Sequence, residues 1–217
     1  TKISRTDFHM PPRKCLLCNQ DAFVCSRSRT HSVDEILTRE CEIMEDYFHH
    51  QYAHQISSLA MASLLYEVAT PKPGLVDRDN SGSHKDMDFY TFQSSAVSLN
   101  QFFEEFTLCG IKNHKRSCED TFALIRPIGI QAEAVMKQAT NGVNTHKGMI
   151  FSLGIFCCAL GYLYGNDIPY TEASFRDTCR QMTAHILDDF QGITLETAKT
   201  HGERLYARYG ITGIRGE

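Results

Sequence analysis

Residues 89–106 read FYTFQSSAVSLNQFFEEF, and this stretch decides the fold. Its apolar side chains recur every three or four residues, which places them on one face of an α-helix. Asp86, just upstream, can accept hydrogen bonds from the free N–H groups at the start of that helix. Strand-like alternation is almost absent from the chain, so this helix is expected to pack against other helices. Its apolar positions are Phe89, Phe92, Ala96, Leu99, Phe103 and Phe106.

Two helical segments are expected on the N-terminal side of this stretch. Ser32 and Glu35 form a capping box, in which each side chain satisfies a free backbone N–H group at a helix start. A second apolar stripe, over residues 56–68, has spacings of three and four and is stopped by Pro71. We place a module boundary within residues 38–50.

Four more helices are expected toward the C-terminus. The segments are 117–140, 145–164, 171–190 and 200–209, opened by Ser117, Thr145, Thr171 and Thr200. Pro127 either kinks the first of them or starts a second helix, and Gly142 is placed to cap its end. The predicted fold is all-α: a multi-helix bundle or orthogonal array of about seven or eight helices, after a small, loop-rich, Cys-containing N-terminal tail.

Composition excludes several classes of function. The chain has 217 residues and a net charge of −4, whereas proteins that bind nucleic acid by counterion release need a basic surface. Its nine cysteines are odd in number, and several lie in apolar helical sequence, so we expect them to be reduced and the protein to be cytoplasmic. Residues 148–166 are uncharged but interrupted by glycines and tyrosines, which favours a buried helix over a membrane span. We therefore expect neither a nucleic-acid nor a membrane partner.

A polar loop at residues 67–88 concentrates carboxylates, cations and a histidine. The sequence Asp86-x-Asp88 at a helix start offers hard oxygens that could hold Mg²⁺ while the ion keeps several waters. The alternatives are a solvated surface loop and simple capping of the helix by the Asp pair.

A second polar loop, GVNTHKG at residues 142–148, lies between a helix end and an apolar helix. Free backbone N–H groups, a hydroxyl and the Lys147 ammonium can hold phosphate there. The alternative is an N-cap threonine beside a solvated lysine. The two loops together fit an enzyme that acts on a nucleoside triphosphate. Ser94 and Ser95 have no His and Asp at a recognisable spacing, so no hydrolase triad is predicted.

The spacing Cys15-x2-Cys18-x6-Cys25-x5-His31 offers four zinc ligands close together in sequence. Because the second pair is irregularly spaced, we favour reduced cysteines that pack a small tail over a zinc site.

Four motifs, in order, resemble the signatures of the triphosphoribosyl-dephospho-coenzyme A synthase family: EVATPKPGLVD (67–77), GSHKDMD (82–88), GVNTHKG (142–148) and TGIRGE (212–217). RKCLLC (13–18) and CSRSRTH (25–31), with Glu35, resemble the C-terminal tail of apo-citrate lyase phosphoribosyl-dephospho-coenzyme A transferase. The resemblance implies a tail of the transferase at residues 1–45 and a C-terminally truncated synthase domain at 46–217. The chain would then be a piece of a bifunctional fusion.

The resemblance implies transfer of the 5-triphosphoribosyl group of ATP to the ribose 2′-hydroxyl of 3′-dephospho-coenzyme A, with release of adenine. The product is the precursor of the citrate lyase prosthetic group. The parent protein would also act as holo-citrate lyase acyl-carrier-protein synthase, a nucleotidyltransferase, with that carrier protein as its partner. Two alternatives stay open: an Mg²⁺-dependent nucleotide phosphohydrolase on a helical scaffold, and an inactive fragment that serves as a carrier-protein interaction module.

Residue roles follow from the motifs and from an oxocarbenium-like transition state, which needs a held triphosphate and proton transfer. We assign Mg²⁺ to Asp86 and Asp88, with Asp77 or Asp79. Phosphate is assigned to Lys72, Gly74, Asn144, Thr145, Lys147 and Gly148, with Arg215 as a further anion clamp. Acid/base work is assigned to Glu67, His84, His146 and Glu217.

Overall fold

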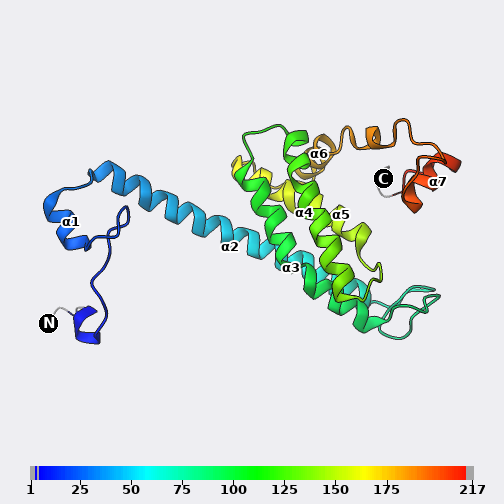
Figure 1. Cartoon of the computed structure of the whole chain (residues 1–217), viewed down its shortest axis with the longest axis horizontal. Helices are drawn as coiled ribbons and strands as arrows, with labels where there is room; N and C mark the ends of the chain where they lie inside the picture. The colour runs from blue at the N-terminus through cyan, green and yellow to red at the C-terminus, as the bar shows by residue number, and fades with distance from the viewer. Residues whose placement is uncertain (1–2, 4, 214–217) are drawn as a thin grey trace. The chain divides into compact units, whose positions relative to one another are not determined.

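The computed structural model describes residue 3 and residues 5–213. Every regular secondary-structure element among these residues is a helix. Their one β feature is an isolated bridge between Lys14 and Asp21. The all-α prediction is confirmed. The elements are η1 (Arg5–Phe8), α1 (Ala22–Ser28), α2 (Val33–Ala69), α3 (Phe89–Lys112), α4 (Cys118–Ala139), α5 (Lys147–Gly165), α6 (Glu172–Met182), η2 (Ile186–Phe190) and α7 (His201–Tyr209) (Figure 1).

The chain divides into two compact units, residues 1–51 and 52–217, and the division falls inside α2. In the first unit, Cys25 is the one buried side chain among the described residues. The predicted capping box opens α2: the Ser32 hydroxyl accepts the Glu35 N–H at 3.1 Å, and Glu35 accepts the Ser32 N–H at 2.8 Å. The assignment of residues 1–45 to a transferase tail stays a prediction.

The second unit is built around α3, which packs against α4 and α5 (Figure 1). Leu99, Phe103 and Phe106 of the predicted stripe are fully or almost fully buried. Helix α5 is long and apolar enough to cross a membrane by length and composition alone, yet residues along it, from Ile150 to Leu163, are buried in this unit. The prediction that residues 148–166 form a buried helix, and not a membrane span, agrees with the place of α5 in this unit.

Two glycines let α3 and α5 approach at backbone distance. A Cβ atom on Gly110 would lie 2.1 Å from the carbonyl oxygen of Cys158, and one on Gly161 would lie 2.1 Å from that of Thr107. Because both obstacles are backbone atoms, no side-chain rotation could relieve either clash. The glycines therefore fix how closely the two central helices of the unit cross.

Several predicted helix boundaries were wrong. Residues 33–69 form one helix instead of two. Asp88, and not Asp86, caps α3, because Thr91 completes a reciprocal capping box with it. Helix α4 continues through Pro127, so of the two alternatives for this proline the start of a second helix was wrong. The helix predicted over 171–190 ends at Met182 and is followed by the short η2.

The helix ends around the second polar loop also differ from the prediction. Helix α4 ends at Ala139, with Asn141 in the left-handed conformation, and the Gly142 N–H group bonds back to the Lys137 carbonyl at 2.7 Å. Gly142 therefore helps to close the helix as predicted. Thr145 does not cap α5: the N-cap position is His146, which makes no side-chain cap, and the Thr145 hydroxyl is used elsewhere.

Candidate functional site

The polar loop after α2 is organised by one buried carboxylate, Asp77. Its Oδ2 accepts the N–H of Lys72 at 2.7 Å, and its Oδ1 accepts the N–H groups of Asp79 and Asn80 at 2.8 and 3.0 Å. These backbone donors hold the pKa of Asp77 below its usual value. The loop is therefore pinned at its centre by a charged group that has little capacity left for a ligand.

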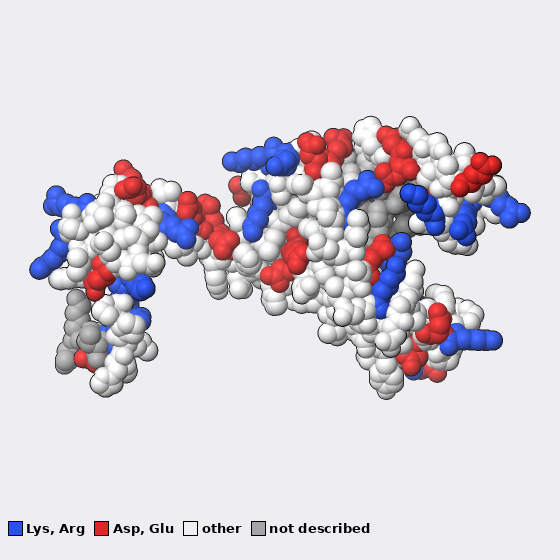
Figure 2. All heavy atoms as spheres, viewed as in Figure 1, with Lys and Arg blue, Asp and Glu red and all other residues white. Residues whose placement is uncertain are grey.

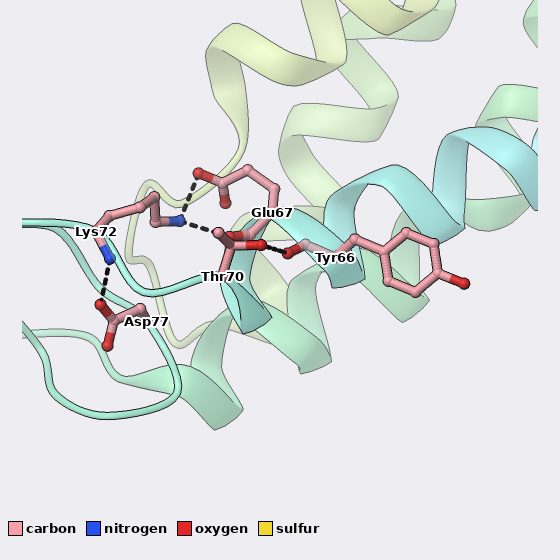
Figure 3. Close-up of polar contacts among 5 residues, drawn as sticks. All are labelled: Tyr66, Glu67, Thr70, Lys72 and Asp77. Carbon is pink, nitrogen blue, oxygen red and sulfur yellow. Dashed lines mark hydrogen bonds and ion pairs between the residues drawn. The ribbon is translucent and has the colours of Figure 1, made fainter.

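Lys72 joins this loop to the end of α2. Its Nζ donates to the carboxylate of Glu67 at 2.6 Å and to the Glu67 carbonyl at 2.7 Å, while its backbone N–H reaches Asp77 (Figure 3). Thr70 ends the helix by donating its hydroxyl to the Tyr66 carbonyl at 2.7 Å (Figure 3). Glu67 and Lys72 thus form a partly exposed ion pair in a fixed position.

The same loop folds back on itself at two glycines. Gly74 adopts φ +75°, and its carbonyl accepts the Ser83 N–H at 3.1 Å. Gly82 adopts φ +57°, and a Cβ atom there would lie 2.4 Å from the backbone of Gly74. Both the positive φ and the close approach require glycine. Gly74 is therefore a turn residue, and its assignment to phosphate stays a prediction.

His146 lies buried at the start of α5 and ends a short chain of hydrogen bonds. The Thr145 hydroxyl donates to Ser95 Oγ at 2.7 Å, and Ser95 Oγ lies 2.7 Å from His146 Nδ1. Because Ser95 receives its hydrogen bond from Thr145, it can give its own proton to Nδ1. In that arrangement His146 carries its proton on Nε2, which is buried and has no hydrogen-bond partner among the described residues.

The electrostatics of His146 keep it neutral. Burial lowers its pKa from 6.5 to about 4, while the charge of Glu67 raises the pKa and that of Lys72 lowers it. Phe92 packs its ring edge-on against the imidazole, with 4.9 Å between ring centroids. The Glu67–Lys72 pair of the first loop is therefore close enough to act on the histidine of the second, although some 75 residues separate them in sequence.

Lys147, next to His146, reaches a carboxylate on α4. Its Nζ lies 3.2 Å from Glu133, and half of the Lys147 side chain is exposed. Glu133 also lines an apolar pocket of about 220 Å³ among α3, α4, α5 and η2. Arg126 and Asp189 form a bidentate ion pair at the same pocket, with its shorter contact at 2.6 Å. The remaining lining is mainly aromatic and aliphatic, including Phe106, Phe122, Ile125, Ile130 and Phe151.

The four carboxylates assigned to Mg²⁺ differ in their fitness for it. Asp77 already accepts three backbone N–H groups, and Asp88 Oδ1 accepts both the N–H and the hydroxyl of Thr91 at 2.8 and 2.7 Å. Asp79 and Asp86 are exposed, and their ion pairs with described residues are longer, to Arg78 at 3.5 Å and to His84 at 3.9 Å. Within the described ranges these four do not converge on one point. Asp79 and Asp86 fit an ion that keeps most of its waters and arrives on a phosphate.

Sequence reasoning missed two members of the site. Ser95 was set aside for lack of a partner histidine, yet it bonds His146 across 51 residues. Among the described residues no carboxylate completes a triad, and Ser95 is fully buried, so the pair is not a hydrolase nucleophile. Glu133 carried no motif at all. His84 and Asn144 lie exposed on their loops, and Arg215 and Glu217 lie outside the described residues.

The fold and the site together define a helical protein with two polar loops, one of which holds the Glu67–Lys72 ion pair and the other a buried histidine. Residues 53–217 match the family model of ATP:dephospho-CoA triphosphoribosyl transferase, and the chain belongs to this family. Residues 1–47 match the model of apo-citrate lyase phosphoribosyl-dephospho-CoA transferase. The resemblance drawn from the motifs is confirmed.

Curated relatives agree with both matches. The chain is 39% identical to "Protein CitXG" of Haemophilus influenzae over 99% of its own length and 47% of the relative's. It is also 39% identical to the 2-(5''-triphosphoribosyl)-3'-dephosphocoenzyme-A synthase of Haemophilus ducreyi, over 93% of this chain and 66% of that protein. The chain thus spans about half to two thirds of these relatives. No solved structure matches it.

Proposed function

We propose that this chain carries the site that transfers the 5-triphosphoribosyl group of ATP to the ribose 2′-hydroxyl of 3′-dephospho-coenzyme A, with release of adenine. Family membership over residues 53–217 and the names of the relatives support this reaction class. The observation that carries the proposal is the buried, unpartnered Nε2 of His146 in the second motif, whose pKa responds to the charges of Glu67 and Lys72 in the first.

In the proposed reaction the bond from C1″ of the ribose to N9 of the base breaks, and its electron pair leaves with the base, which takes up a proton from solvent to give adenine. The 2′-hydroxyl oxygen of the acceptor bonds to C1″ and gives up its proton. Glu67 is assigned as the proton acceptor, since its carboxylate lies at the loop and is partly exposed. We assign neutral His146 to the departing base: its Nε2, buried in the free chain, would donate a hydrogen bond once substrate binding uncovers it, which favours a leaving group that gains charge.

Lys147, Lys72 and the N–H groups of residues 144–148 are assigned to the triphosphate, with Arg215 as a further clamp. Mg²⁺, when bound with ATP, would neutralise part of the triphosphate charge, and Asp79 and Asp86 are the residues assigned to hold it. We assign the pocket beside Glu133 to an adenine base, which both substrates carry, because aromatic walls and a polar rim suit a flat heterocycle. The citrate lyase acyl carrier protein as partner, the second transferase activity and a cytoplasmic location are proposals on the same footing.

Product analysis tests the reaction. The chain is incubated with ATP, Mg²⁺ and 3′-dephospho-coenzyme A, and the products are identified by mass spectrometry. Free adenine and an acceptor heavier by the triphosphoribosyl group are expected. Phosphate release without adenine would replace the proposal by a phosphohydrolase, and absence of ATP binding would favour an interaction module.

Two variants test the site itself. Lys147→Met keeps the apolar stem and removes the ammonium, so ATP affinity should fall by about 1.5–3 kcal/mol, with Lys115→Met on an exposed loop as control. Gly129→Leu places a side chain at the pocket, where a Cβ atom on Gly129 meets nothing within 4 Å. It should block base binding, whereas Gly202→Leu, equally open on α7, should not. Unchanged ATP affinity in both site variants would remove them from the binding site.

A further inference from the structure

The N-terminal unit contains a cluster of soft ligands that the proposed transfer reaction does not use. One ligand atom from each of Cys15, Cys18, Cys25 and His31 lies within 4.8 Å of the others. Cys25 Sγ is 3.5 Å from Cys15 Sγ and 3.9 Å from Cys18 Sγ. Two sulfurs bound at about 2.3 Å to one tetrahedral zinc ion lie about 3.8 Å apart. The sulfur separations therefore match a shared zinc ion and are far too long for a disulfide.

The local backbone is built to bring these ligands together. A short antiparallel pairing joins Lys14 to Asp21, and the Cys15 N–H bonds the Gln20 carbonyl at 2.9 Å, so Cys15 and Cys18 lie on one tight turn. The Leu17 N–H points at Cys15 Sγ, 3.5 Å away. An N–H donor to sulfur is a second-sphere contact that orients a thiolate ligand.

A helix supplies the third ligand and its end supplies the fourth. Asp21 caps α1 by accepting the Phe23 N–H at 2.8 Å, and α1 presents Cys25 as its one buried residue. Arg29 then turns the chain in the left-handed conformation, with φ +48°, which brings His31 back to the cluster. His31 Nε2 is buried and has no hydrogen-bond partner among the described residues. A buried imidazole nitrogen beside three thiols is costly unless it binds something.

We infer that Cys15, Cys18, Cys25 and His31 bind one structural Zn²⁺ ion. Three thiolates and an imidazole form a closed tetrahedral Cys₃His set, which leaves no open position for catalysis. Soft sulfur ligands favour zinc over Mg²⁺ or Ca²⁺. The three thiolates, the imidazole and the ion together carry a net charge of −1. Arg13, Lys14 and Arg29 line the same pocket as two of the cysteines and His31 and can balance this charge. Basic side chains of this unit are blue in Figure 2.

The rest of this unit explains why a metal is needed there. Cys25 is its one buried side chain among the described residues, while Phe8, Leu17, Phe23 and Val24 are exposed. A segment this small cannot build a sufficient apolar core, and metals or disulfides usually replace one. The preference for simply packed cysteines that the irregular spacing suggested is therefore reversed.

The first test measures metal in the whole 217-residue chain, purified under reducing conditions without a histidine tag. One zinc per chain is expected, and cobalt substituted for it should show the intense visible absorption of a tetrahedral thiolate site. Cys25→Ser should lose the metal, and Cys41→Ser, which removes an exposed thiol of the same unit, should keep it. A chain with free thiols that holds no more metal than Cys25→Ser, or a native Cys15–Cys25 disulfide, would overturn the inference.

A second pair of variants guards against simple misfolding. His31→Ala should weaken zinc binding by about 100-fold or more, and His31→Cys should restore it as a Cys₄ site with stronger sulfur-to-cobalt absorption. Equal affinity in both variants would show that His31 is not a ligand.

Proteolysis gives a readout apart from metal content. A chelator should raise tryptic cleavage at Arg27 and Arg29 by about tenfold or more, while sites in residues 52–217 keep their rates and serve as the internal control. Unchanged cleavage at Arg27 and Arg29 after complete metal removal would contradict a structural role.

Discussion

Residues 1–51 and residues 52–217 differ in what lies at their centres. The larger unit buries aromatic and aliphatic side chains from α3, α4 and α5 in one cluster. The smaller unit buries Cys25 alone among its described residues and gathers two further thiols and an imidazole around it. The larger unit is stabilised by apolar area removed from water, whereas we propose that the smaller one is stabilised by a few directed bonds to a metal ion. The two should therefore respond to different perturbations.

The largest effect is expected where α3 and α5 cross. Gly161→Ala would drive a Cβ atom into the Thr107 carbonyl, so the helices must separate and the free energy of unfolding should fall by about 4 kcal/mol or more. The same change at Gly129, where nothing lies within 4 Å, should instead stabilise α4 by about 0.5–1 kcal/mol. Denaturant titration of both variants measures the contrast. A tolerated Gly161→Ala would mean that the crossing is looser than the structure has it.

Identical substitutions in the two units sharpen the comparison next. Leu99→Ala in the core of the larger unit should lower the free energy of unfolding by about 3 kcal/mol, since the cavity cannot collapse fully. Leu37→Ala, half exposed on the part of α2 in the smaller unit, should cost at most about 0.5 kcal/mol. Thermal denaturation with and without a chelator resolves both. Similar losses at the two positions would contradict a metal-centred N-terminal unit.

The pH dependence should come from the larger unit through His146. His146 takes up a proton near pH 6.5 in the unfolded chain and only near pH 4 in the folded chain. Its contribution to the free energy of unfolding is therefore fully present above pH 6.5 and is lost as the pH falls from 6.5 to 4. The total loss is about 3 kcal/mol. His146→Gln, measured by denaturant titration at several pH values, should flatten this part of the curve. The same slope in the variant would assign it to another group.

A smaller effect is expected at the start of α2. Ser32→Ala removes the hydroxyl that accepts the Glu35 N–H, one residue after His31 of the proposed zinc site. Loss of such a cap typically costs about 1 kcal/mol. Hydrogen exchange of the first-turn amides of α2 should rise accordingly, while exchange in α3 stays as it was. Unchanged protection would show that the zinc site alone holds this helix start.

Local sequence patterns predicted the positions of most helices. Which residues cap them, and where one helix continues into the next, depended on contacts that these patterns do not contain. The apolar stripe of 89–106 and the capping boxes at Ser32 and Thr200 are read directly from spacing. From the sequence, Asp86 and Asp88 are equally good candidates for the N-cap of α3. The Thr91 side chain, which pairs with Asp88, decides between them. The continuous α2 escaped prediction because no local signal excludes two helices.

The candidate site was harder to predict for the same physical reason. Its loops were found from composition and motif, but the sequence holds no sign that Ser95 meets His146 across 51 residues. Thr145 could cap a helix, yet its hydroxyl donates to Ser95. Ser95 in turn bonds the buried His146, which needs a hydrogen-bond partner. The motif indicated Asp77 as a metal ligand, and nothing in the sequence showed that its carboxylate also holds its own loop together through backbone N–H groups.

The turn that ends α4 also affects how the protein ages. Asn-Gly sequences such as Asn141-Gly142 deamidate when the glycine nitrogen attacks the asparagine side chain and forms a succinimide. Here the Gly142 N–H group is held at 2.7 Å by the Lys137 carbonyl, so the nucleophile is tied down while the helix end is intact. Peptide mapping after storage should find Asn141 preserved in the folded chain and converted in denaturant. Conversion would add a negative charge beside the loop proposed to bind phosphate. The hydrogen bond that closes α4 therefore also protects this loop from chemical damage.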